Sequence, residues 1–342
     1  MSEAPISLLM DVDTGVDDCV ALLLALSSPR AELMAVTCCA GNVPASQAAA
    51  NTLAVLELAG AGHVEVALGS LAPLLVPLRT ATGHGPRGLG YAELPDANAS
   101  LSPRFAPDLL VAEARRRPGE LLLVATGPLT NVALAVRRDP ELPRLLRRLV
   151  IMGGAFEHAG NTTPAAEFNV AVDPEASKLV LDAFSSAPIR PLICGLNVTE
   201  QAELSPEHLR RLAELAGGVP DEAPDLGDPP GTRSASSNSL VRCLSDALRF
   251  SMEAHVELGH DYVAQMHDPL ALALALDPSL GETRPGTVDV ELQGSLTRGM
   301  TVVDWRGDWG RPHNAEVAVE VDVPRFRDEL IERIAALARR VG

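Results

Sequence analysis

The chain has 342 residues, of which 46% are hydrophobic and only 3% aromatic, and its formal net charge is −17 at pH 7. This length is enough for a large α/β domain, whose core must consist mainly of aliphatic side chains. The acidic balance argues against nucleic-acid or anionic-membrane binding, because contacts to phosphate groups need an excess of lysine and arginine.

The cysteines and the N-terminal residues predict a cytoplasmic location. The five cysteines are odd in number and lack the spacing of a zinc site. Residues 1–7 lack the charged and apolar regions of a signal peptide. Apolar stretches are too short for a membrane span. We therefore expect a soluble protein in a reducing cytoplasm, with no membrane partner.

Apolar runs alternate with helical periodicity through the first two thirds of the chain, which predicts βα units and a mostly parallel sheet. The predicted strands are Ile6–Met10, Leu33–Cys39, Val64–Leu68, Leu121–Ala125, Leu149–Met152 and Pro191–Cys194. The predicted helices are Asp17–Ser27, Ala45–Leu58, Pro107–Arg116, Leu129–Arg137, Pro174–Phe184 and Pro206–Leu215.

The last third has a different pattern. A long helix over 238–258 and a second helix over His267–Leu276 precede short strands at Val288–Leu292, Thr301–Val303 and Glu316–Val321 and a closing amphipathic helix over Arg325–Arg340. These elements predict an α/β fold with an open, mostly parallel Rossmann-like sheet flanked by helices, and extra C-terminal helices and short strands.

Residues 217–237 are rich in Gly, Pro, Asp and Ser and have the composition of a linker. They could separate two domains, but the helices that follow carry further site candidates. We therefore predict a single domain over 1–342, with 217–237 as a mobile loop within it.

Four carboxylates follow the first predicted strand within eight residues, at Asp11, Asp13, Asp17 and Asp18. A helix N-terminus favours acidic residues, so a well-capped surface helix would explain the last two. Packing the first two beside them is repulsive unless a cation lies among them, and hard divalent metals bind such oxygen clusters. The segment therefore predicts a metal site at the end of the first strand.

Polar segments follow the other strands as well, where ligands bind in open α/β sheets. They are Gly41-Asn42, Gly83-His84-Gly85, the run from Thr126 to Asn131, Gly153-Gly154 and the loop from Asn161 to Asn169. Together with the acidic segment, Asp173-Pro174-Glu175-Ala176 and His267-Asp268-Pro269-Leu270-Ala271, these motifs resemble the nucleoside hydrolase family, the inosine–uridine-preferring nucleoside N-ribohydrolases. The resemblance extends from about Leu8 to Phe326 and implies that family's fold.

The resemblance implies Ca²⁺-dependent hydrolysis of the N-glycosidic bond of ribonucleosides, giving ribose and a free purine or pyrimidine base. The implied Ca²⁺ ligands are Asp13, Asp18, the Thr126 carbonyl and Asp268. Ribose recognition would fall to Asp17, Asn42, Asn161, Glu167 and Asn169, with Phe168 lining the pocket or packing beside it. The family also implies a homodimer or homotetramer.

The chemistry needs a base and an acid around an oxocarbenium-like transition state. Asp13 is the predicted base for water, and Asp11 is expected to support the other carboxylates. His267 is the first candidate to protonate the leaving base and His84 the second. Taken alone, His84 reads as a turn residue and Asp268 as a helix N-cap.

Three residues depart from the family pattern. Thr14 stands where proline is usual, Asn197 replaces a usual aspartate, and Arg87 occupies a position that is often acidic or polar. None of the three is an implied metal ligand, and Arg87 puts substrate preference rather than activity in doubt.

Two other functions are compatible with parts of the pattern. An aspartate-nucleophile phosphohydrolase also begins its first motif with Asp-x-Asp, but it needs Thr or Val where this chain has Gly15. A non-catalytic nucleoside or sugar binder on the same scaffold would tolerate loss of the metal ligands, whereas this sequence retains all of them.

Overall fold

A computed structural model describes residues 4–218 and 223–342, and the described residues form a nine-stranded sheet in the order β10-β9-β11-β6-β5-β4-β1-β2-β3. Strands β1 to β6 and β11 run parallel, whereas β9 and β10 pair antiparallel at one edge. The predicted α/β class with a mostly parallel sheet is therefore confirmed.

The bounds of the elements follow the predicted ones closely. The strands are β1 Ile6–Val12, β2 Ala31–Cys38, β3 Glu65–Leu68, β4 Leu122–Ala125, β5 Arg148–Met152, β6 Leu192–Cys194, β7 Glu203–Leu204, β8 Ala264–Gln265, β9 Gly281–Val290, β10 Thr301–Asp304 and β11 Ala315–Val321. The helices are α1 Val16–Ser27, α2 Ala45–Leu58, α3 Ala106–Arg116, α4 Thr130–Arg138, α5 Leu142–Leu145, α6 Phe168–Val172, α7 Pro174–Phe184, α8 Leu196–Thr199, α9 Pro206–Leu215, α10 Ser239–Glu257, α11 His267–Leu276 and α12 Val323–Val341.

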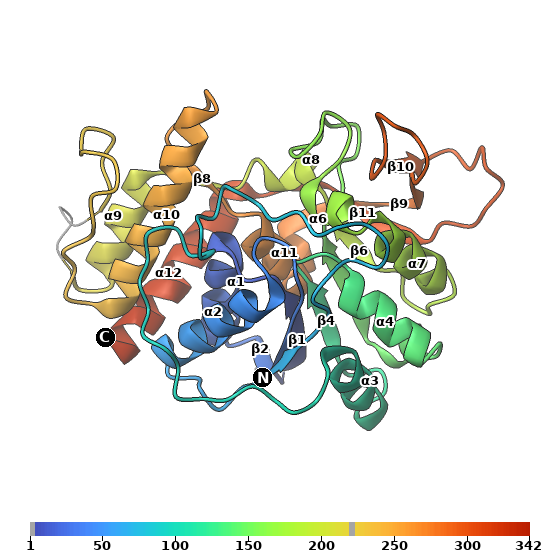
Figure 1. Ribbon diagram of the computed structural model, residues 1–342, viewed down its shortest axis with the longest axis horizontal. Helices are drawn as coiled ribbons and strands as arrows, with labels where there is room; N and C mark the ends of the chain where they lie inside the picture. The colour runs from blue at the N-terminus through green and yellow to red at the C-terminus, as the bar shows by residue number, and fades with distance from the viewer. Residues whose placement is uncertain (1–3, 219–222) are drawn as a thin grey trace.

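The sheet separates two hydrophobic cores, because successive side chains of a strand point to opposite faces. On β1, Leu8 and Met10 join the core beneath α1, α2, α11 and α12, whereas Leu9 joins the core beneath α3, α4 and α7. Figure 1 shows these two groups of helices on opposite sides of the sheet. Both faces of the central strands are covered, which explains their continuous apolar runs.

The chain order of the strands places a crevice at the carboxyl end of the sheet. After β1 the chain builds β2 and β3 on one side and then returns to build β4, β5 and β6 on the other. Neighbouring strands β1 and β4 thus mark the switch point where ligands bind in open α/β sheets. Helix α11 packs on α1 and brings the start of the C-terminal third to the same place.

The short elements are where the structure departs from the sequence prediction. Strand β9 begins at Gly281, seven residues before the predicted strand, because it pairs with β11 over that stretch in spite of Pro285. Helices α5, α6 and α8 and the two-stranded sheet β7-β8 were not predicted. Such short pieces depend on tertiary contacts and have no periodicity of their own.

The predicted mobile loop 217–237 lies partly outside the described residues, at 219–222. Its described part is attached to α10: Asp228 pairs with the buried Arg249 at 2.6 Å, and the Ser234 amide donates to Asp246 at 2.7 Å. Its mobility and the single-domain organisation remain predictions. Within the described ranges, every helix is too short or too polar to cross a membrane.

Candidate active site

Three carboxylates meet at the switch point of the sheet. Asp17 and Asp18 lie in the first turn of α1, and Asp268 lies in the first turn of α11. Their oxygen atoms lie within 4.8 Å of one another, and all three side chains are buried. The packing of α11 on α1 thus joins residues that are 250 positions apart in the sequence, as the motifs predicted.

Asp13 lies at the end of β1, beside this cluster and beneath the loop that follows β2. Its Oδ2 accepts the backbone amide of Asn42 at 2.6 Å, while its Oδ1 is buried without a hydrogen-bond partner. A Cβ at Gly41 would lie 2.0 Å from Oδ2, so a glycine is required for this close approach. An orphaned buried carboxylate oxygen points to a ligand that the polypeptide does not supply.

The arrangement fits a hard divalent cation. Burial, followed by the charge of Asp18, raises the pKa of Asp13, and burial with the charge of Asp17 raises the pKa of Asp18. Burial and the charges of Asp17 and Asp18 also raise the pKa of Asp268 well above its usual range. In the described part of the chain, no lysine or arginine forms an ion pair with these four groups. Oxygen ligands without a protein counter-ion are the donors that Ca²⁺ and Mg²⁺ take.

Asp18 is also the best-anchored member of the cluster. Its Oδ2 accepts from the Gly15 amide at 2.8 Å and from Asn42 Nδ2 at 3.2 Å, and its Oδ1 accepts from Thr126 Oγ1 at 2.8 Å. These donors come from the loops after β1, β2 and β4. The three loops therefore converge on one carboxylate, which fixes its position.

A cavity of about 480 Å³ opens above the cluster. The predicted site residues that line it are Asp17, Asn42, His84, Thr126, Asn161, Glu167, Phe168, Asn169, His267 and Asp268. Asp13 and Asp18 are fully buried and are not part of its lining. The volume is in the range of small-molecule sites.

The loop before α6 supplies amides and a carboxylate to one wall. Glu167 caps α6, and its two oxygens accept the backbone amides of Asn169, Val170 and Gly154 at 2.7–3.0 Å. Asn169 Nδ2 donates to the Thr126 carbonyl at 2.6 Å. The Thr126 carbonyl, an implied metal ligand, therefore uses one of its two lone pairs to accept from Asn169. The second lone pair is free to face a cation.

His84 lies in the strap formed by residues 84–90 and faces the cluster. Its Nδ1 accepts the backbone amide of Val16 at 3.0 Å and lies 3.9 Å from Asp17 Oδ1. Because Nδ1 is an acceptor, the proton of the neutral ring is on Nε2. Burial lowers the pKa of His84, which favours this neutral form.

His267 stands at the start of α11, next to Asp268. Its Nδ1 lies 2.9 Å from Thr199 Oγ1, so Nε2 is the ring nitrogen that can serve a ligand. Burial lowers the pKa of His267 to about 3. His255 of α10 lines the same cavity, and its Nδ1 is buried without a partner.

Asp11 lies behind the site. Its Oδ1 accepts from Thr37 Oγ1 at 2.6 Å and from Asn131 Nδ2 at 2.8 Å, and burial raises its pKa to about 7. Thr37 and Asn131 were not predicted as partners of this carboxylate. Both lie at the carboxyl end of the sheet, at the end of β2 and the start of α4. Their position next to predicted strand ends could have identified them as neighbours of Asp11.

The departures from the family pattern lie outside the cavity lining. Thr14 Oγ1 pairs with Thr52 Oγ1 at 2.6 Å, and Asn197 Nδ2 donates to the Ala318 carbonyl at 2.9 Å. Arg87 is exposed and lines a separate cavity over α2. None of the three touches the carboxylate cluster through its side chain.

Comparison with known proteins agrees with this architecture. A family model described as inosine-uridine preferring nucleoside hydrolase matches residues 8–328. The chain belongs to this family. The nucleoside hydrolase assignment from the motifs is thus confirmed, and the phosphohydrolase interpretation is set aside.

Nucleoside hydrolases of several organisms align over nearly the full length. The chain is 37% identical over 332 residues to the pyrimidine-specific ribonucleoside hydrolase RihA of Citrobacter koseri, with 96% of this chain and 98% of the relative covered. The solved purine-preferring ribonucleoside hydrolase from Gardnerella vaginalis superposes with a TM-score of 0.86 at 31% identity, covering 98% and 99% of the two chains. A plant nucleoside hydrolase, PpNRh1, gives a TM-score of 0.84 at 33% identity, covering 97% and 99%.

Proposed function

We propose that this nucleoside hydrolase cleaves the N-glycosidic bond of ribonucleosides with the help of one Ca²⁺ ion. The observation that carries the proposal is the buried cluster of Asp17, Asp18 and Asp268 at the floor of a cavity that also holds His84 and His267. Carboxylates at the floor and ring nitrogens in the wall match the two ends of a nucleoside, a diol and a base.

We assign the ion to Asp13, Asp18, Asp268 and the Thr126 carbonyl. When bound, Ca²⁺ would supply positive charge that offsets the buried carboxylates and lowers the pKa of a nearby water. Asp17 belongs to the same cluster, so its side chain is placed to touch both the ion and a ribose hydroxyl.

The remaining roles follow from the positions of the side chains. Asp13, with one oxygen unpartnered, accepts the proton of the attacking water. Asn42, Asn161, Glu167 and Asn169 orient the ribose, and Phe168 forms the wall beside them. The carboxylates also stabilise the ribosyl cation as the bond to the base breaks.

The leaving base needs a hydrogen-bond donor in the wall of the cavity. His267 presents Nε2 because its Nδ1 is engaged by Thr199, and His84 presents Nε2 because its Nδ1 accepts from Val16. We assign protonation of the leaving base to His267 and a supporting contact with the base to His84. Both groups face the same cavity, so one nucleoside can contact both.

For the base itself we propose a preference for pyrimidine ribonucleosides. Identity is 37% to the relative named pyrimidine-specific and 31% to the structure named purine-preferring, and both comparisons cover nearly the whole chain. Uridine and cytidine are therefore expected to be cleaved faster than inosine, adenosine and guanosine. Equal or faster cleavage of the purine nucleosides would refute this preference.

The test of the function is a panel of these five ribonucleosides, incubated with the purified protein in calcium and in a chelator. We expect release of free base and ribose in equal amounts in calcium alone. Nucleoside binding without release of base would favour the non-catalytic binder instead.

We also propose a cytoplasmic homodimer or homotetramer. In the described residues all five cysteines are buried and unpaired, which suits a reducing compartment. Light scattering at micromolar concentration tests the assembly, and a monomeric mass would contradict it.

A further inference from the structure

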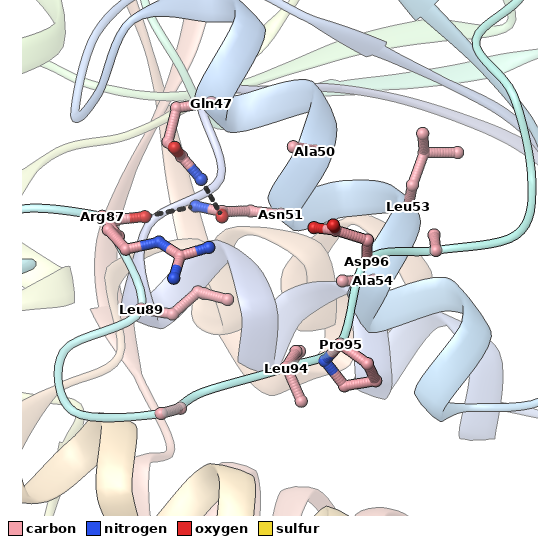
Figure 2. A pocket seen from close by; sticks show the side chains of 12 residues that line it. Gln47, Ala50, Asn51, Leu53, Ala54, Arg87, Leu89, Leu94, Pro95 and Asp96 are labelled. Atoms are coloured by element: carbon pink, nitrogen blue, oxygen red, sulfur yellow. Dashed lines mark hydrogen bonds between the residues drawn. The ribbon is translucent and has the colours of Figure 1, made fainter.

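A buried amide on α2 connects the acidic loop, residues 13–15 between β1 and α1, to the strap 84–90 that carries His84. Asn51 is 5% exposed, and its Nδ2 donates to two backbone carbonyls, that of Thr14 at 3.0 Å and that of Arg87 at 2.8 Å. Its Oδ1 accepts from Gln47 Nε2 at 2.8 Å. Figure 2 shows the side chain of Asn51 reaching from the helix between Gln47 and the strap. Because both carbonyls are acceptors, only the NH₂ group can face them.

The first of these carbonyls belongs to the peptide between Thr14 and Gly15. The N–H of the same peptide donates to Asp18 Oδ2 at 2.8 Å. Asn51 therefore holds one end of a peptide group whose other end holds a carboxylate of the cluster. Rotation of this peptide would break both hydrogen bonds together, since the group is planar.

The second carbonyl belongs to the strap 84–90. The strap is compact, because the Gly88 amide donates to the Gly85 carbonyl at 3.1 Å and the Gly90 amide to the His84 carbonyl at 2.8 Å. Gly88 has φ +84, and a Cβ there would lie 2.8 Å from Asn51 Nδ2. The backbone of the strap is thus in close contact with this amide, and the His84 ring accepts from the backbone amide of Val16, which follows the acidic loop as the first residue of α1.

We propose that Asn51 is a positioning residue, which fixes the acidic loop and the His84 strap relative to each other through one amide group. The proposal rests on the proposed function, in which Asp18 and His84 serve the same nucleoside. Loss of the amide leaves two carbonyls without their donor and frees both segments. A displacement of about 1 Å at a catalytic group costs on the order of 100-fold in rate, so the effect belongs mainly to kcat.

The test compares Asn51→Leu with Thr52→Val, a matched change at the next residue of the same helix. Thr52 is fully buried and bonds the side chain of Thr14, but it contacts neither the Thr14–Gly15 peptide nor the strap in the interactions described above. We expect similar losses of melting temperature, a fall in kcat on the order of 10- to 100-fold for Asn51→Leu, and a largely retained kcat for Thr52→Val. Equal losses of kcat in the two variants would overturn the proposal.

Hydrogen exchange of the calcium-loaded proteins supplies a readout that is independent of turnover. Asn51→Leu should speed exchange in peptides covering 13–19 and 84–90 together, whereas Thr52→Val should leave 84–90 unchanged. Wild-type exchange at 84–90 in Asn51→Leu would refute the link. If the wild-type chain released no base, the proposed function would fail, while this exchange experiment would still decide the role of Asn51.

Discussion

At the scale of single residues, repulsion among buried carboxylates dominates the site. Four carboxylates are buried together, and burial is the largest cause of the raised pKa of each. Such a cluster destabilises the fold unless an ion or protons neutralise it. The ion that we propose would offset this repulsion and stabilise the loaded protein.

Asp268→Asn tests this balance directly. The variant should lose at least about 100-fold in kcat/KM and in calcium affinity, because one ligand oxygen of the site loses its charge. Calcium titration by calorimetry and initial rates measure the two effects. Asp96→Asn, which removes an exposed carboxylate, is the control and should behave as wild type. Unchanged calcium affinity in Asp268→Asn would contradict the assignment.

His267→Ala tests the leaving-group role. Nucleosides need help at the base, so their kcat/KM should fall by about 10²- to 10⁴-fold, whereas an activated nitrophenyl riboside should lose far less. Parallel assays of the two substrates measure the difference, with the exposed His63→Ala as the control. Equal losses on both substrates would remove His267 from this role.

At the scale of elements, side chains behind the site hold strand ends in register. Asn131 at the start of α4 donates to Asp11 at the end of β1, and its Oδ1 accepts the Ser70 amide just beyond β3 at 2.9 Å. One buried amide thus joins α4, β1 and the segment after β3, so the hydrogen bonds that fix these three segments form and break together. The loops that carry the site follow these strand ends and are therefore held in place.

Asn131→Ala should lower the free energy of unfolding by about 1–3 kcal/mol, because it removes one of the two donors to the buried Asp11 carboxylate and the acceptor of the Ser70 amide. Urea denaturation measures the change. Asn98→Ala, whose side chain bonds Glu57 at the surface, should cost much less. Equal losses in the two variants would show that the Asn131 network does not stabilise the strand ends.

The sequence predicted the elements with strong periodicity and the residues within motifs. Strands β1 to β6 and helix α12 were placed within a few residues, because buried parallel strands and amphipathic helices leave clear patterns. Strand β9 and helix α8 were misplaced or missed because tertiary pairing defines them. Asn51 was missed for a related reason, since an asparagine within a helix shows no sign of the two carbonyls that it meets.

At the scale of the whole molecule, the fold brings together carboxylates from both ends of the chain. Residues of the first loop and of α11 meet because α11 packs on α1 over the carboxyl end of the sheet. The order of the motifs predicted that Asp18 and Asp268 lie together, whereas the geometry of the cavity required the three-dimensional structure. Ion binding at such a junction should stabilise the global fold.

Removal of calcium should therefore lower the melting temperature of the whole chain. An ion present at 100 times its Kd stabilises the folded state by about 2.7 kcal/mol, which corresponds to a shift of several degrees. Thermal scans in calcium, in chelator and in chelator with excess calcium restored measure it. A melting temperature that is the same in all three would contradict a structural role for the ion.

In the proposed function, base release depends on the ion bound by Asp13, Asp18 and Asp268. The most direct measurement is the initial rate of uridine hydrolysis as a function of free calcium, made beside a calcium-binding titration of the same protein. We expect the rate to rise from near zero and to saturate with the binding curve. A full rate in chelator, or no hydrolysis of any ribonucleoside at saturating calcium, would contradict it.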